Sequence, residues 1–418
     1  MVGGFLFELL DSLARLWHRR ACALASGAMT RTPSDSDQPP TLLPGRATTA
    51  GTRKFADRQR CAEDHFARPD ALWLSSIALG TLRGNPGGID DLLYRSVVGD
   101  FLEGSGNVFN TALSDRMQTS ERALGHALAR VIAEGGATRD EIVIVSKGGA
   151  LTPNPEFARD PTRAHRDLYA SYLDPGILDP SDVTRGHSMA PRFLLDQVER
   201  SRRNLGIETI DYYLIQEPEI HLRALGTDGF RMALANDFEA LELAVEKGWI
   251  GAYGLCTWDG FLLPDSDRSH LSIVDLFDVA LDVGSADHHL RVLQFPFGLA
   301  MGEGAVMESQ LGPDGHSRAI LGSLQDTGTV VMASAPLYAG RLIGHVPAFV
   351  RKAFPEAPSE ATAALQFVRS TANVTTAVVG MREAAHVEDN MRLRVIPRAD
   401  RDLPMRLFSQ ANQQGAAL

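Results

Sequence analysis

The chain of 418 residues is long enough for one large α/β barrel with extensions or for two smaller domains. Its apolar fraction of 44% and charged fraction of 22% are close to those of soluble globular proteins, which excludes a wholly disordered or fibrous chain. The formal net charge of -11, with no long run of Lys or Arg, argues against nucleic acid as a ligand, because binding to a phosphate backbone needs concentrated positive charge.

The three cysteines, Cys22, Cys61 and Cys256, are widely spaced and lack the close pairs that a zinc site or a redox motif requires. We therefore expect no metal site and a reducing, cytoplasmic environment. No run approaches the ~20 apolar residues that a membrane-spanning helix needs, so we expect no membrane span.

The first 28 residues contain an apolar stretch, residues 5–17, which is followed and not preceded by Arg19 and Arg20. That order is wrong for a secretory signal peptide, and the spacing fits a short amphipathic helix that docks on the rest of the protein or on a membrane surface. We favour the alternative that translation starts at Met29 or that these residues fray. Residues 30–50 are rich in Pro, Ser, Thr and Asp, which predicts a flexible leader.

From residue 72 onward, short runs of β-branched and other apolar residues alternate with longer stretches of helical periodicity. This alternation is typical of repeated βα units and a parallel sheet. Eight units favour a closed barrel over an open doubly wound sheet, and no Gly-x-Gly-x-x-Gly follows the first strand. The predicted strands cover residues 75–80, 108–112, 141–146, 211–215, 250–255, 292–295, 329–333 and 375–379.

Helical periodicity is clearest over residues 120–134, where Ser120 is placed to cap the helix. Further apolar stripes cover residues 192–205, 237–247 and 360–369, and the glycines that should end these or neighbouring helices are Gly206, Gly248 and Gly328. We therefore predict an α/β fold in two parts, a largely flexible N-terminal extension over residues 1–55 and a (β/α)8 TIM barrel over residues 56–418.

The link between the third and fourth predicted strands, residues 150–187, is unusually long and contains five prolines. Such length is uncommon between a strand and a helix of a compact domain. We expect this link to fold over the mouth of the barrel, either as a lid that excludes water or as a loop without a function.

Several segments that follow predicted strands form motifs in a consistent order. They are Asn110-Thr111-Ala112, Ser146-Lys147-Gly148-Gly149, Gln216-Glu217-Pro218-Glu219, and Val379-Gly380-Met381-Arg382 with His386-Val387-Glu388-Asp389-Asn390. Residues 199–216 add a fifth segment, and the whole match covers residues 72–395. In this order they resemble the aldo-keto reductase superfamily, whose members are (β/α)8 barrels that hold NADP(H).

The resemblance implies a catalytic tetrad. In the family, a Tyr donates a proton to the carbonyl oxygen, a Lys lowers the pKa of that Tyr, an Asp pairs with the Lys, and a His orients the carbonyl. On these positions the chain carries Asp115 for the Tyr, Asn110 for the Asp and Gln216 for the His, and it keeps only Lys147. The tetrad is therefore predicted to be degenerate, and it lacks the proton donor of the family.

Asp115 would restore, from the other side of Lys147, the negative charge that Asn110 lacks. Beside that ammonium we predict a pKa for Asp115 below the ordinary value of about 3.9. Our hypothesis for a catalytic pocket is that Asp115 is a general base and Lys147 an electrostatic clamp, and the alternative is a leftover ion pair in an inactive pocket. Gln216 is able to orient a carbonyl through its amide, and we interpret His221 as a surface loop residue.

The resemblance also implies a nucleotide site. Gln294, at the end of the sixth strand, occupies the position whose amide meets the nicotinamide carboxamide. The positions that family members use around the adenosine 2′-phosphate and the adenine are Gly380, Arg382, His386, Asp389 and Asn390. Because Arg382 is able to bind a phosphate bidentately, we expect NADP(H) rather than NAD, aided by the helix N-terminus near Glu383.

Two residues depart from the family pattern on the nicotinamide side. Ser334 stands where many members have an aromatic ring, and Cys256-Thr257 replace a polar pair. Three functions therefore stay open: an NADP(H)-dependent oxidoreductase of a small carbonyl or alcohol substrate with altered proton transfer, a non-redox isomerase or lyase that uses Asp115 and Lys147, and a cofactor-binding pseudoenzyme with a regulatory role. All three bind a small molecule, and the sequence indicates no oligomeric state.

Overall fold

Eight parallel strands close into a barrel at the centre of the computed structural model, which describes residues 42–157, 160–312 and 315–414. Around the barrel the strand order is β3-β4-β5-β6-β7-β8-β11-β12, and β12 pairs with β3 to close the ring. The strands are β3 (Ile77–Gly80), β4 (Val108–Asn110), β5 (Val143–Gly148), β6 (Ile210–Gln216), β7 (Ile250–Cys256), β8 (Leu290–Pro296), β11 (Val330–Ser334) and β12 (Thr376–Gly380). The predicted (β/α)8 TIM barrel is confirmed, with all eight strands near their predicted positions.

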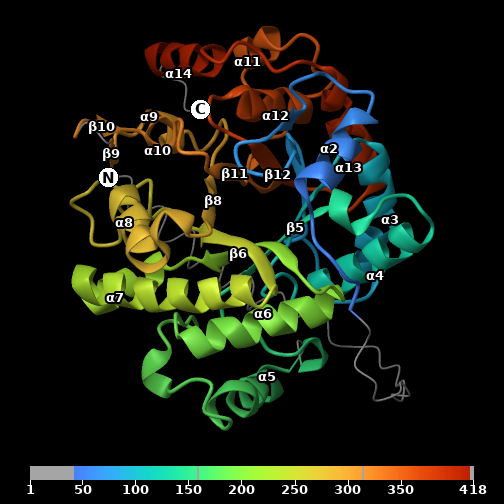
Figure 1. Cartoon of the computed structure of the whole chain (residues 1–418). Coiled ribbons are helices and arrows are strands. Elements are labelled where there is room, and N and C mark those ends of the chain that lie inside the picture. The colour runs from blue at the N-terminus through green and yellow to red at the C-terminus, as the bar shows by residue number, and fades with distance from the viewer. Residues whose placement is uncertain (1–41, 158–159, 313–314, 415–418) are drawn as a thin grey trace.

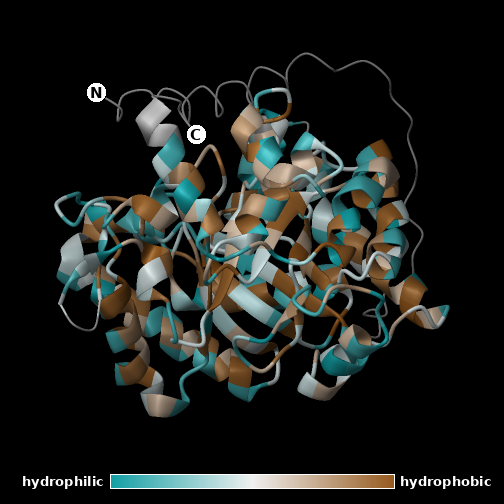
Figure 2. Cartoon of the chain, turned by 90° about the horizontal axis from the view of Figure 1, so that it is seen from above, coloured by the Kyte–Doolittle hydropathy of each residue, from teal (hydrophilic) through white to brown (hydrophobic). Residues whose placement is uncertain are grey.

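Helices form a ring around the strands (Figure 1), and both hydrophobic and hydrophilic residues occur along them (Figure 2). The long helices are α3 (Ile89–Glu103), α4 (Thr119–Ala133), α6 (Pro191–Leu205), α7 (Glu219–Glu246), α8 (Ile273–Gly284), α12 (Glu360–Ser370) and α14 (Leu403–Gln414). The shorter ones are α2 (Thr49–Asp57), α5 (Pro161–Leu168), α9 (Glu303–Val306), α10 (Ile320–Ser323), α11 (Ala348–Ala353) and α13 (Ala384–Met391). None of the described helices is both long and apolar enough to span a bilayer.

Two cores hold these layers together. The first fills the inside of the barrel and is built from small and β-branched residues such as Val108, Val145 and Val292. The second lies between the strands and the helices and contains most of the buried aromatic side chains. Because the strands are covered on both faces, their sequences are nearly continuous apolar runs, which is why they could be predicted.

Some helix boundaries differ from the predicted ones. Ser120 does not cap α4, because its hydroxyl donates to the carbonyl oxygen of Thr81 at 2.8 Å and the helix begins after Gln118, which has a left-handed backbone (φ 69°). Helix α7 begins at Glu219 rather than at residue 237 and is interrupted at Gly226 (φ 69°). Gly206 ends α6 in the left-handed conformation (φ 67°), as predicted.

The N-terminal extension is ordered earlier than we predicted. Residues 42–57, which we expected to lie largely in a flexible segment, pack at the N-terminal ends of the strands: Leu43 pairs with Ile207, and the Ala47 amide donates to the Asp211 carboxylate at 2.7 Å. Asp211 also binds Arg139 at 3.0 Å, so a buried ion pair anchors this segment. The rest of the extension, residues 1–41, lies outside the described residues.

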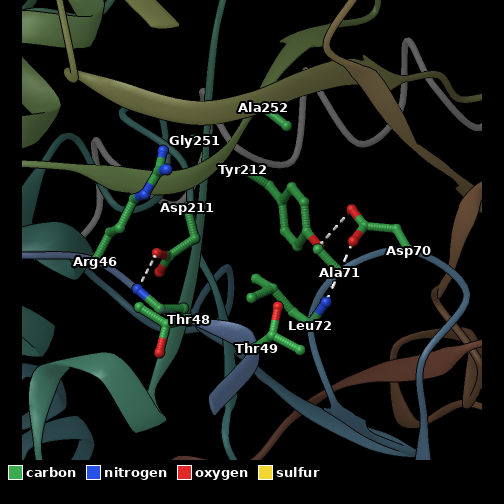
Figure 3. A pocket seen from close by; sticks show the side chains of 11 residues that line it. Arg46, Thr48, Thr49, Asp70, Ala71, Leu72, Asp211, Tyr212, Gly251 and Ala252 are labelled. Carbon is green, nitrogen blue, oxygen red and sulfur yellow. Dashed lines mark hydrogen bonds between the residues drawn. The ribbon is translucent and has the colours of Figure 1, made fainter. Parts of the chain in front are cut away.

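The same end of the barrel is covered by a hairpin and contains a cavity. The hairpin that covers this end consists of β1 (Phe66–Ala67) and β2 (Leu74–Ser75). A second short hairpin, of β9 (Gln310–Leu311) and β10 (Ser317–Arg318), lies beside α10. The cavity has a volume of about 270 Å³, and Arg46, Asp70 and Tyr212 are among the side chains that line it (Figure 3). The Tyr212 hydroxyl donates to Asp70 at 3.1 Å. Since chemistry in such barrels occurs at the C-terminal ends of the strands, this cavity is not the candidate active site.

The closeness of β7 and β8 gives a stability prediction. A Cβ atom on Gly254 would lie 1.8 Å from the carbonyl oxygen of Val292, so Gly254→Ala should force the two strands apart and lower the free energy of unfolding by about 3 kcal/mol or more. Gly99→Ala is the matched control, because no atom lies within 4 Å of a Cβ there and alanine favours the helix by up to about 1 kcal/mol. Urea unfolding of both variants tests this, and equal midpoints would refute it.

Candidate active site

Five polar or sulfur-bearing side chains point inward at the C-terminal ends of the strands. They are Asn110, Lys147, Gln216, Cys256 and Gln294, each of which lies two residues, or four for Cys256, beyond an inward-facing residue of its strand. Because side chains alternate between the two faces of a strand, this spacing places all five toward the barrel axis. The strand register supports this, since Cys256 pairs with both Gln216 and Gln294.

Lys147 is the centre of a hydrogen-bond network across the barrel. Its ammonium donates to the Asn110 side-chain oxygen at 2.6 Å and to the Thr111 carbonyl oxygen at 2.7 Å. The Asn110 amide nitrogen in turn donates to the Gln294 side-chain oxygen at 2.9 Å. The structure therefore brings together three of the predicted site residues, all less than 7% exposed, through neutral oxygens.

Asp115 lies elsewhere than we predicted. Its carboxylate is 3.0 Å from the Thr81 hydroxyl, which is also 2.8 Å from the hydroxyl of Thr111. Asp115 is therefore held by hydroxyls of the residues that directly follow β3 and β4. It makes no ion pair within 4.0 Å with Lys147, whose bonds go to Asn110 and to the backbone.

The predicted pKa of Asp115 is wrong in direction. Burial raises the pKa of this carboxyl, and the opposing effects of Lys147 and of the Thr81 hydrogen bond are too small to reverse the shift. A carboxyl that holds its proton more tightly is a weaker candidate for the ionised general base that we inferred from the sequence. The predicted Lys147–Asp115 ion pair is likewise not formed.

Gln216 is fixed by two partners from different segments. Its side-chain oxygen accepts a hydrogen bond from the Ser114 hydroxyl at 3.0 Å, and its backbone oxygen accepts one from His187 Nε2. His187 Nδ1 lies 2.8 Å from His221 Nε2. Because the backbone oxygen only accepts, His187 carries its proton on Nε2, and its Nδ1 accepts from His221. This chain of bonds holds the end of β6.

His221 is therefore not the surface residue that we predicted. It is 4% exposed, and His187 is 2% exposed. Burial lowers the pKa of His187 to about 3, so this imidazole is neutral at physiological pH. Sequence reasoning missed His187 because it lies 29 residues from Gln216 along the chain, at the end of the long link.

The long link, residues 150–187, has a small core of its own. Tyr172 and Leu178 pack against Phe193 of α6, and α5 lies beside α6 at the edge of the molecule (Figure 1). The two ends of the link meet where Ala150 pairs with His187. A Cβ on Gly149 would come within 2.2 Å of His187 Nε2, so glycine is needed at this crossing. Its role as a lid stays a prediction.

A cluster of acidic side chains, which sequence reasoning did not single out, consists of Glu217 and Glu219 after β6 and Asp259 after β7. Glu219 accepts a hydrogen bond from the Trp258 amide at 2.7 Å, while its second carboxyl oxygen is buried and no described residue hydrogen-bonds to it. Burial raises the pKa of Glu219 to about 8, with smaller contributions from Glu217 and Asp259. The same burial raises the pKa of the Cys256 thiol to about 12, so both groups hold their protons at neutral pH. The two acids that flank Pro218 were the signal for this cluster in the sequence.

The predicted nucleotide residues lie around α13. Gly380 ends β12, and Arg382 follows it in the loop that leads to the helix. His386 is exposed on α13, whereas Asn390 is buried and Asp389 accepts a hydrogen bond from the Ser359 hydroxyl at 2.6 Å. The structure thus brings these five positions together, separate from Gln294 at the barrel axis.

Comparison with known proteins agrees with this architecture. The model of the aldo/keto reductase family matches residues 76–261. A D-threo-aldose 1-dehydrogenase from Pseudomonas sp is 27% identical over 148 residues, which are 35% of this chain and only 38% of that relative.

Solved structures extend the likeness over most of the chain. An aldo/keto reductase from Klebsiella pneumoniae in complex with NADP and acetate is 18% identical, with a TM-score of 0.54 and coverage of 82% of this chain and 95% of that one. The glycerol dehydrogenase AKR11B4 from Gluconobacter oxydans is also 18% identical, with a TM-score of 0.57 and coverage of 85% and 98%. At this identity the structures show the fold alone, and the family match makes the chain similar to the aldo/keto reductases over residues 76–261.

The raised pKa of Glu219 predicts a pH-dependent stability. The folded protein keeps a proton on Glu219 up to a pH of about 8, whereas the unfolded chain releases it near the ordinary value of 4.5. Stability is therefore fully present below the lower value and is lost as the pH rises through the higher one. Glu219→Gln mimics the protonated form, so its melting temperature should match that of the wild type at about pH 5 and exceed it by several degrees at about pH 9.

Glu246→Gln is the control for this experiment, because Glu246 is exposed on the same helix. It should follow the wild type at both pH values. A Glu219→Gln variant that melts below the wild type at high pH would show that the carboxylate stabilises the fold in its ionised form.

Proposed function

We propose that the protein is an NADP(H)-dependent oxidoreductase that acts on a small carbonyl or alcohol substrate with altered proton-transfer residues. The observation that carries the proposal is the position of Lys147, whose ammonium is buried at the C-terminal mouth of the barrel and is hydrogen-bonded through Asn110 to Gln294. Relatives of the same fold are described as bound to NADP or NADPH. The proposal thus rests on Lys147 together with the residues at the expected nucleotide positions.

The residues present fit such a cofactor at both ends. Gln294 uses its side-chain oxygen for Asn110, and no hydrogen bond ties its amide nitrogen to a described residue, so this nitrogen suits the carboxamide of a nicotinamide. At the other end, Arg382 is 37% exposed, so its guanidinium is accessible to an anionic group although Nη1 is already paired with Asp90 at 2.7 Å. When bound, NADP(H) supplies or accepts the hydride.

The protein's own residues would act on the substrate oxygen. A cation such as Lys147 stabilises the negative charge that grows on a carbonyl oxygen during reduction, and a dry site strengthens that effect. Gln216 adds an amide group at the rim, held in place by Ser114 and His187. The proton comes from water or from an acid other than the lost tyrosine.

A second function, that of a cofactor-binding pseudoenzyme with a regulatory role, rests on one observation. Lys147 donates to Asn110 and Asn110 donates to Gln294, so these groups are already paired, and Asp115 hydrogen-bonds to Thr81 instead of pairing with Lys147. The same position of Asp115 weakens the third alternative, an isomerase or lyase that uses Asp115 with Lys147.

Titration with NADPH tests the proposal first. We expect the nucleotide fluorescence to rise on binding, and we expect Gln294→Ala to weaken the binding about tenfold, because it removes the amide at the nicotinamide position. A wild-type protein that leaves the fluorescence unchanged would exclude both the oxidoreductase and the cofactor-binding pseudoenzyme.

Turnover separates these two functions. With a panel of small aldehydes and NADPH, we expect oxidation of the nucleotide and a loss of kcat of about 100-fold or more in Lys147→Met. Lys352→Met, which removes an exposed lysine, should keep the wild-type rate. Binding of NADPH without turnover of any aldehyde or alcohol would favour the pseudoenzyme.

A further inference from the structure

The cation at the expected 2′-phosphate position already has a partner. Arg382 Nη1 lies 2.7 Å from Asp90 Oδ1, and its Nε lies 3.7 Å from Glu383. Asp90 is only 5% exposed, whereas Arg382 is 37% exposed. A buried carboxylate next to an exposed guanidinium neutralises much of the charge that a phosphate would use.

Asp90 is fixed in this position by its surroundings. It lies in the first turn of α3, where the helix N-terminus favours a negative charge. Its second oxygen accepts a hydrogen bond from the Asn85 amide at 2.7 Å. A Cβ on Gly84, which has a φ of +114°, would lie 2.8 Å from Asp90 Cγ, so the loop before the helix is closed tightly around the carboxylate.

The neighbouring acid, Asp91, has a different role. It forms an ion pair with Arg116, which is buried and also donates to the Asn85 carbonyl oxygen. The two acids of the same helical turn therefore bind two different arginines. Only Asp90 is linked to the nucleotide positions.

We infer that Asp90 is a specificity-determining residue of the nucleotide site, which weakens binding of a 2′-phosphorylated dinucleotide relative to an unphosphorylated one. This inference rests on the proposed function. A 2′-phosphate that takes Arg382 leaves the Asp90 carboxylate buried without its cation and close to a second anion, and both effects cost free energy. A ribose 2′-hydroxyl meets no such penalty, because it donates a hydrogen bond to a carboxylate.

The ratio of the dissociation constants for NADPH and NADH tests the inference. Asp90→Asn keeps the shape of the side chain and an acceptor for the Asn85 amide but removes the charge. We expect it to tighten NADPH binding about tenfold and to change NADH binding less than about twofold. Asp91→Asn is the matched control, since it removes one charge from the same turn of α3 and should leave the ratio within about twofold of the wild type.

The outcomes separate the inference from the proposed function. If wild-type protein binds neither nucleotide, the proposed function fails and the inference fails with it. If both nucleotides bind and Asp90→Asn leaves their ratio unchanged, or changes it no more than Asp91→Asn does, the inference alone is overturned. Asp90→Ser, which retains a hydroxyl acceptor for Asn85, replaces Asp90→Asn should that variant fail to fold, and the same tightening is expected of it.

Discussion

The rest of the site depends on how the buried ammonium of Lys147 is satisfied. A cation taken out of water needs a counter-charge or several well-placed oxygens, and here Asn110 and the Thr111 backbone supply oxygens without charge. The nearby Asp115 carboxyl hydrogen-bonds to Thr81 and forms no ion pair with Lys147 within 4.0 Å, and burial raises its pKa. The barrel mouth therefore holds positive charge that substrate or cofactor is able to meet.

The two ends of the proposed nucleotide site differ in how strongly they are occupied by the protein's own groups. At the axis, Gln294 is engaged through one of its two polar atoms, whereas at the periphery Arg382 is paired with a carboxylate that is held from three sides. The motif around Arg382 thus accounts only for the positive charge of this ion pair and not for the negative one. The negative charge comes from Asp90 of α3, which lies 292 residues before Arg382 in the chain.

The barrel, and the places of Lys147 and Gln294 near the C-terminal ends of its strands, were predictable because they depend on local patterns. Strands that are buried on both faces have continuous apolar sequences. The surroundings of Asp115, His187 and Asp90 depend on contacts between segments distant in sequence. Asp115 is followed by three residues with left-handed backbones, Arg116, Met117 and Gln118, and this turn, which no glycine announces, directs its carboxyl toward Thr81.

The hydrogen bonds that join His221 to His187 and His187 to the backbone of Gln216 affect which parts of the sequence are free to change. The two ends of the segment 150–187 meet where Ala150 pairs with His187, and the segment has its own core against Phe193. A change in the length of the segment therefore alters a closed loop and leaves the register of the barrel strands unchanged. The entropy of closing a loop grows slowly with its length. Insertions, deletions or exchanges between Leu151 and Gly186 would therefore change this loop while the barrel keeps the same scaffold.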